Sequence, residues 1–103
     1  MFIVLYRWRT KKGMEEQLVE NWSKVTEYYM KNFDALGSRL HLGNDGIWYA
    51  YAQWKSAEHR ERAFAEREYL IERDKMGEAI EEFLPEILLE TVSDLLLFPA
   101  KTQ

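Results

Sequence analysis

The sequence predicts one α+β domain in which strands and helices follow in the order β-α-β-β-α-β. Three observations predict it: a β-prone first segment, two stretches with apolar side chains at helical spacing, and two β-prone runs around a short Gly/Asn/Asp loop. The chain has 103 residues, of which 47% are hydrophobic. This length suits one compact domain and is too short for two. We therefore expect residues 1–103 to form a single domain.

The first strand and the first helix occupy the N-terminal third of the chain. The segment Phe2 to Arg9 is rich in β-branched and aromatic residues and ends at a polar turn, which predicts a strand. From Met14 onward, apolar side chains recur at steps of three and four residues and so share one face of a helix. They are Leu18, Trp22, Val25, Tyr29 and Phe33. The stripe ends near Leu36 and Gly37, where the glycine predicts the end of the helix.

A β-hairpin is the strongest local prediction. The runs Ser38 to Leu42 and Ile47 to Trp54 are β-prone, and the Gly-Asn-Asp-Gly segment between them is typical of a hairpin loop. If the loop centres on its Asn-Asp pair, Leu42 lies opposite Ile47. That register places His41 opposite Trp48, and Arg39 opposite Ala50.

The last third of the chain predicts a helix followed by a strand. Apolar residues recur at roughly helical intervals from Ala57 to Leu84, with a slip between Ala65 and Leu70 that predicts a break or kink. Pro85 is expected to end this helical region because proline interrupts helical hydrogen bonding. The segment Glu86 to Leu97 then reads as the final strand, and Pro99 is expected to close the ordered part.

Both faces of the predicted sheet carry large apolar side chains. In the first strand Phe2, Val4, Tyr6 and Trp8 alternate with Ile3 and Leu5, and in the third strand tryptophans and alanines alternate with Ile47, Tyr49 and Tyr51. An antiparallel sheet with one wet face would alternate apolar with polar residues. Two helices cover only one face, so we expect the other to pair with a second copy in a twofold dimer. The alternative is a monomer with an apolar, tyrosine-rich face.

Composition excludes several classes of function. The formal net charge is −4 and basic residues are interleaved with acidic ones, which argues against a nucleic-acid partner. Cysteine is absent, so disulfides and thiolate sites are excluded. The two histidines, His41 and His59, lie far apart, and we expect no metal site. The longest apolar run, Phe2 to Tyr6, is far too short to span a membrane and lacks a signal-peptide pattern, so a cytoplasmic location is expected.

Several segments together resemble the antibiotic biosynthesis monooxygenase superfamily. They are the Lys-Gly before the first helix, Leu36 to His41, Tyr49 to Ser56, and the closing Ser93 to Leu96. The resemblance covers nearly the whole chain and implies a ferredoxin-like protomer, with a four-stranded antiparallel sheet, helices on one face, and a dimeric α/β-barrel. Its members include quinol and anthrone oxygenases, haem-degrading enzymes and proteins with no assigned activity. The site must therefore decide the function.

The haem-degrading branch of this superfamily fits poorly. It uses an asparagine near the end of the first strand, a tryptophan on the second helix and a histidine that follows. Here the corresponding positions are near Arg7 and at Ala63 and Phe64, and no histidine follows His59. The resemblance then implies cofactor-independent oxygenation, in which a base deprotonates a phenol-like substrate whose anion reduces oxygen. We expect no cofactor.

The predicted hairpin register suggests where such a site lies. It gathers Arg39, His41 and Trp48 beside two alanines on one face. His41 is the candidate base or proton shuttle because histidine titrates near neutral pH. Arg39 would stabilise the developing negative charge, and Trp48 would form a wall of the pocket beside an aromatic ligand. The alternative is that His41 and Arg39 are edge-strand surface residues.

Other aromatic residues are candidate walls of the same pocket. Trp22 on the first helix, and Tyr6, Trp8 and Tyr51 on the strands, are core or interface residues first and ligand contacts second. Two functions remain open. One is a homodimeric, cofactor-independent monooxygenase acting on a small quinol-type or polyketide-like aromatic; the other is a non-catalytic dimeric module that binds a small ligand. Free space beside His41 and Arg39 favours the enzyme, whereas a pocket filled by Trp22 and Trp48 favours the module.

Overall fold

The structure is a computed structural model that describes residues 1–97. It contains four strands and three helices in the order β1-α1-β2-β3-α2-α3-β4 within that range. Their bounds are β1 Phe2–Thr10, α1 Glu15–Phe33, β2 Gly37–Leu42, β3 Trp48–Trp54, α2 Ala57–Glu66, α3 Ile71–Glu78 and β4 Ile80–Leu89. The predicted order of elements is confirmed, with the second helical region divided in two.

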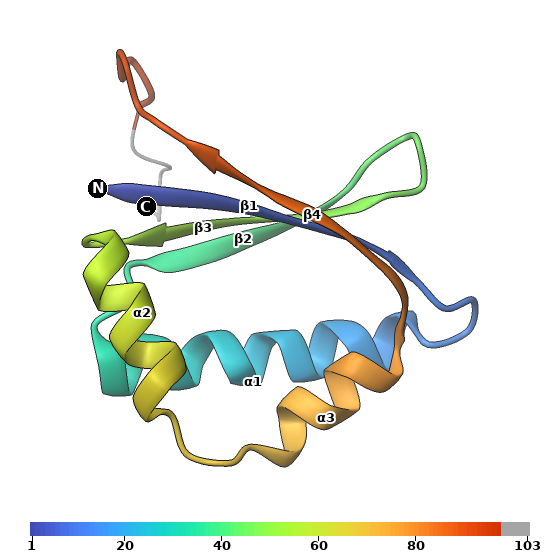
Figure 1. The fold of residues 1–103 in the computed structure, drawn as a ribbon. Coiled ribbons are helices and arrows are strands. Elements are labelled where there is room, and N and C mark those ends of the chain that lie inside the picture. Colours follow the sequence, from blue (N-terminus) through green and yellow to red (C-terminus); the bar gives the residue numbers. More distant parts are fainter. Residues whose placement is uncertain (98–103) are drawn as a thin grey trace.

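The four strands form one antiparallel sheet in the order β2-β3-β1-β4. All three helices lie on the same side of this sheet, with α1 running beneath it and α2 and α3 beside α1 (Figure 1). The fold is therefore the predicted ferredoxin-like α+β arrangement. We call the side that faces the helices the inner face and the opposite side the outer face.

Helix α1 lays its apolar stripe against the inner face. Leu18, Val25 and Tyr29 are buried, as the spacing predicts. The helix ends at Phe33, before the predicted glycine, because Asp34 already takes the left-handed conformation that ends helices (φ 58°), and its N–H bonds to the Tyr29 carbonyl.

The second helical region ends earlier than the sequence suggests. Helix α3 stops at Glu78, and the residues from Ile80 to Leu84, predicted as helix, belong to strand β4. The predicted final strand is present, but its predicted bounds, Glu86 to Leu97, are wrong at both ends, because β4 runs from Ile80 to Leu89. The apolar residues Ile80, Phe83 and Leu84 have helical spacing, and pairing with β1 overrides this local preference and makes the segment a strand. Pro99 lies outside the described residues.

Pro85 lies inside β4 without disrupting the sheet. Strand β4 is at the edge of the sheet, where a missing N–H costs no ladder bond. The register shifts at this point: Leu5 pairs with Ile87, but Arg7 pairs with Leu84. Two residues of β4 thus oppose Tyr6 alone, which is a β-bulge. The Pro85 carbonyl accepts hydrogen bonds from Arg7 Nε (3.1 Å) and Nη2 (2.9 Å).

The predicted hairpin register is wrong by one residue. Leu42 pairs with Trp48, His41 with Tyr49, and Arg39 with Tyr51. The cause is that Ile47 belongs to the loop, where its carbonyl accepts from the Gly43 N–H (2.8 Å). Asp45 fixes that loop by accepting from the Ile47 N–H (2.9 Å) and from the Tyr49 hydroxyl (2.6 Å). A slip of one residue moves a side chain to the other face of the sheet.

The inner face and the helices enclose two clusters of buried residues. One contains Val4, Val25, Tyr29, Trp54 and Ala63, and the other contains Trp8, Leu18, Ala50, Ala79 and Ile80. A cavity lies between them. Over residues 1–97, the structure has no helix that is long and apolar enough to cross a membrane.

Candidate functional site

A cavity of about 410 Å³ lies between the inner face of the sheet and the three helices. Its ceiling comes from alternate residues of two central strands: Tyr6 and Trp8 on β1, and Ala50, Ala52 and Trp54 on β3. The two alanines leave space because their methyl groups stop short of the helices. The sequence alternation of β3 thus places the two alanines on the same face as Trp54, which also lines the cavity.

The helices supply the floor and the sides. Helix α1 presents Trp22, Val25, Thr26 and Tyr29, which are three and four residues apart and so share one side of the helix. Helices α2 and α3 add Phe64, Arg73 and Met76, the residue after α2 adds Arg67, and β4 adds Phe83 and Glu86. The wall is mainly aromatic and apolar, with a few polar groups, as in most small-molecule sites.

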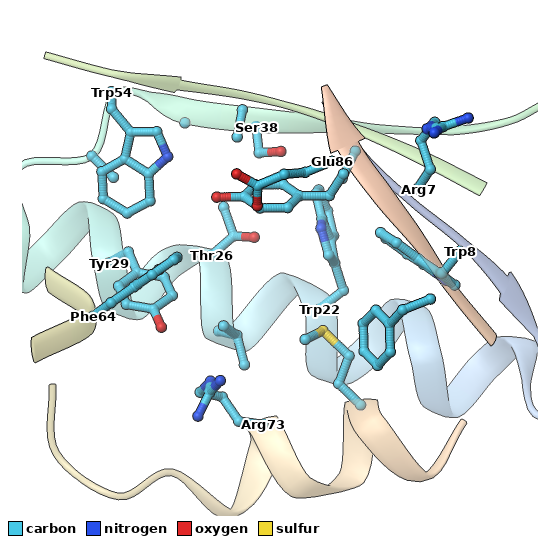
Figure 2. Close-up of a pocket in the computed structure, with 18 of the residues that line it drawn as sticks. Arg7, Trp8, Trp22, Thr26, Tyr29, Ser38, Trp54, Phe64, Arg73 and Glu86 are labelled. Carbon is cyan, nitrogen blue, oxygen red and sulfur yellow. The ribbon is translucent and has the colours of Figure 1, made fainter. Parts of the chain in front are cut away.

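Trp54 brings a hydrogen-bond donor to this wall. The side chain is 4% exposed, and its ring packs at right angles to Phe64 and edge-on to Tyr29, with centroid distances of 5.9 and 5.7 Å. Its Nε1 is the one buried side-chain polar atom in residues 1–97 that makes no hydrogen bond of ordinary length and angle, although it lies near enough to the Tyr6 hydroxyl to lower the pKa of that group slightly against the effect of burial. Figure 2 shows this nitrogen on the side of the indole that faces the middle of the cavity. A buried donor without a partner is costly, so a ligand oxygen placed here would gain a bond that the empty site lacks.

Tyr6, Arg60 and Glu86 form a polar group beside the cavity. Arg60 Nη1 donates to the Tyr6 hydroxyl (3.2 Å) and forms an ion pair with Glu86 Oε2 (3.0 Å). The guanidinium also lies over the rings of Phe2 and Phe64, at 5.4 and 5.5 Å from their centroids. Burial raises the pKa of Tyr6 above 10.0, outweighing the opposing effect of Arg60. Tyr6 therefore keeps its proton at neutral pH and acts as a donor.

The predicted site residues divide between the two faces of the sheet. Tyr6, Trp8 and Trp22 line the cavity. Trp48 is on the inner face and packs against the second core cluster, but it does not line the cavity. Tyr51 lies on the outer face, opposite Arg39.

The predicted grouping of His41 and Arg39 with Trp48 is wrong. Both residues are exposed and lie on the outer face, because His41 pairs with Tyr49 and Arg39 with Tyr51. The one-residue register difference is the whole reason. Free space is present in the protein, but it lies beside Trp22 and Trp54 and not beside His41 and Arg39.

Only some of the site residues that were not predicted had a signal in the sequence. Trp54 shares its face with Ala50 and Ala52 by simple alternation, which already placed it beside the open space. Arg60 and Glu86 gave no such signal, since they meet only through tertiary contact between α2 and the bulge of β4. Among residues 1–97, no cluster of three or more His, Cys, Asp or Glu side chains could hold a metal ion.

Solved structures of other proteins share this fold over almost their whole length. SnoaB, a cofactor-independent oxygenase from Streptomyces nogalater, is 14% identical, with a TM-score of 0.73 over 91% of this chain and 95% of that one. A candidate antibiotic biosynthesis monooxygenase from Nitrosomonas europaea is 14% identical, with a TM-score of 0.72 over 90% of this chain and 100% of that one. This chain has the antibiotic biosynthesis monooxygenase fold.

The same fold occurs in Rv0793 from Mycobacterium tuberculosis, which is 14% identical, with a TM-score of 0.70 over 92% of this chain and 98% of that one. No family model matches the sequence, and no curated protein matches it. The resemblance noted from the sequence is thus confirmed as a resemblance of fold. Chemistry has to be argued from the cavity.

Proposed function

We propose that this protein is a cofactor-independent oxygenase of the antibiotic biosynthesis monooxygenase type, acting on a small electron-rich aromatic in the 410 Å³ cavity. The observation that carries the proposal is the unpartnered Trp54 Nε1 donor in an aromatic wall beside the neutral Tyr6 hydroxyl. Together they suit a flat ligand that carries a phenolic or carbonyl oxygen. SnoaB, which has the same fold, is a cofactor-independent oxygenase.

Each polar group has a role in this reaction. Glu86 accepts the phenolic proton, and Arg60 holds the carboxylate in place through Oε2. Trp54 and Tyr6 donate hydrogen bonds to the resulting oxyanion. The electron-rich anion then reduces O₂ directly. An anthrone reacts as its enol, so the phenolic proton that Glu86 accepts is one of the two hydrogens of the ring CH₂. That carbon becomes C=O with one oxygen atom of O₂, and the other oxygen leaves as water with the proton from Glu86 and the remaining C–H hydrogen.

The test is oxygen uptake with 1,8-dihydroxyanthrone and 1,4-naphthohydroquinone, corrected for their spontaneous oxidation. We expect uptake with the native protein and a loss of at least about tenfold in Glu86→Gln and in Trp54→Phe, which keeps an aromatic ring but removes the donor. His41→Ala is the matched control, because His41 lies on the outer face. Absence of oxygen uptake across a broad panel of quinols and hydroxylated aromatics would refute the proposed oxygenase activity.

The second candidate is a non-catalytic module that binds a small aromatic ligand in the same cavity. It is favoured by one observation: neither His41 nor His59 lines the cavity, so the wall offers no histidine as a general base. This candidate predicts tight binding of the oxidised quinone without oxygen uptake. Calorimetric titration with 1,4-naphthoquinone beside the uptake assay separates the two.

We also propose that two copies pair through their outer faces. Leu5, Tyr49 and Tyr51 are only partly buried there, and Ile87 and Leu89 of β4 are 38% and 39% exposed. Each large apolar side chain removed from water contributes about 1.5–3 kcal/mol. Light scattering should give twice the chain mass, and Tyr51→Lys should give the mass of one chain. A native protein that has the single-chain mass in dilute solution contradicts the dimer. A cytoplasmic location stays a prediction.

A further inference from the structure

Two arginines reach the cavity, one from the C-terminal end of α2 and one from α3. Arg67 is the extended residue that ends α2, three positions after the wall residue Phe64, and Arg73 lies on α3 on the same side of the helix as Met76, three positions later. Both side chains are half-buried. Figure 2 shows Arg73 rising from α3 on the opposite side of the cavity from Ser38 and Trp54.

Neither arginine has a carboxylate partner within residues 1–97. The ion pairs of this part of the chain involve other cations, and the acidic residue that lines the cavity, Glu86, is paired with Arg60. Arg67 contacts neutral groups: its Nη1 donates to the Tyr29 hydroxyl (3.3 Å), and its guanidinium lies 5.1 Å from the Phe64 centroid. A guanidinium carries five N–H donors, so most of its capacity stays open.

A half-buried cation against an aromatic wall carries a desolvation cost, and here it occurs in a protein whose net charge is −4. Removing a charge from water costs free energy unless an anion or hydrogen bonds compensate for it. Arg67 and Arg73 line the cavity together with a third arginine, Arg7, which donates to the Pro85 carbonyl, so the wall as a whole carries more positive than negative charge. An anionic group on the ligand would supply the missing compensation, and guanidinium groups favour the planar, two-oxygen geometry of a carboxylate.

We propose that Arg67 and Arg73 bind a carboxylate of the ligand, so that the site takes aromatic acids whose phenolic end faces the sheet. This proposal rests on the proposed function only in that an aromatic ligand occupies the cavity. The carboxylate lies at the helix side, between the two arginines. The phenolic oxygen lies at the sheet side, near Trp54 and Tyr6.

The test compares two probes that differ only in charge, 6-hydroxy-2-naphthoic acid and 6-hydroxy-2-naphthamide, by calorimetric titration at pH 7. We expect the native protein to bind the acid at least about tenfold more tightly than the amide. This preference should disappear in the Arg67→Gln/Arg73→Gln protein and should persist in part in Arg67→Lys/Arg73→Lys, which keeps both charges. Arg62→Gln is the matched control, because Arg62 is exposed on α2 and does not line the cavity.

The outcomes separate this proposal from the proposed function. Equal affinity for acid and amide in the native protein overturns the carboxylate site and leaves the aromatic cavity standing. A preference for the acid without any oxygen uptake supports the carboxylate site and counts against the enzyme. Failure of both probes and of 2-naphthol to bind overturns both proposals. If the glutamine variant fails to fold by circular dichroism, the native acid-to-amide ratio and the lysine variant decide.

Discussion

Replacing Arg60 by methionine tests whether the Tyr6–Arg60–Glu86 group stabilises the fold as well as the site. Methionine keeps the apolar stem and removes the guanidinium. The hydrogen bond to Tyr6 contributes about 1 kcal/mol. The pair with Glu86 adds only about 0.5 kcal/mol, because the two side chains are 18% and 42% exposed and solvent screens them. Contacts with the Phe2 and Phe64 rings add about 0.5 kcal/mol each.

The expected loss is therefore about 2 to 3 kcal/mol of unfolding free energy. With an m value of about 2 kcal/mol per M of urea, the unfolding midpoint should fall by about 1 M. Tryptophan fluorescence follows the transition, with Arg62→Met as the control, since an exposed position should change stability by less than about 0.5 kcal/mol. An Arg60→Met protein as stable as that control would refute the reasoning. Oxygen uptake should fall as well, because Glu86 loses the group that holds it.

Three further predictions concern single positions. Burial raises the pKa of Tyr6 above 10.0, so the folded state keeps a proton that the unfolded state loses; stability should fall as pH rises past 10.0, and less steeply in Tyr6→Phe, measured by urea unfolding between pH 9 and 12. The hydroxyl of Tyr49 lowers the pKa of Asp45 below 3.8, so that carboxylate stabilises the hairpin above this pH and stops doing so as pH falls; Asp45→Asn should flatten the acid limb of the stability curve. Ala52→Leu should fill the cavity and abolish binding of 1,4-naphthoquinone while circular dichroism stays unchanged, and binding with native affinity would contradict the cavity.

The fold followed from periodicity because its signals are local. The stripe on α1 and the alternation in β1 and β3 depend on neighbouring residues along the chain, and these three elements lie nearly where they were expected. The end of the second helical region did not follow. Ile80, Phe83 and Leu84 are apolar at helical spacing (i, i+3, i+4), and only the contact with β1 selects the strand.

The functional site was predicted from the sequence much less well than the fold, because it depends on strand register and on contacts between distant elements. Ile47 stays in the hairpin loop, where its N–H donates to the Asp45 carboxylate. The resulting one-residue difference in register decides whether His41 faces the cavity or the outer surface. The spacing of apolar residues could predict some of the tryptophans and tyrosines that line the cavity, as Tyr6 on β1 and Trp22 on α1 show. The meeting of Arg60 with Glu86 was beyond it, since it joins a helix to an irregular point of an edge strand.

That irregular point has a consequence for how this protein acquires chemistry. In an unbroken ladder running on from the pairing of Arg7 with Leu84, Glu86 would stand opposite Leu5 and point away from the helices. The extra residue turns it inward, next to Tyr6. Inserting or deleting one residue in an edge strand can thus turn an acidic side chain into the apolar cavity or out of it. The two central strands stay unchanged. Proteins with this fold would then differ in their reactions through insertions in an edge strand as much as through substitutions in the central strands.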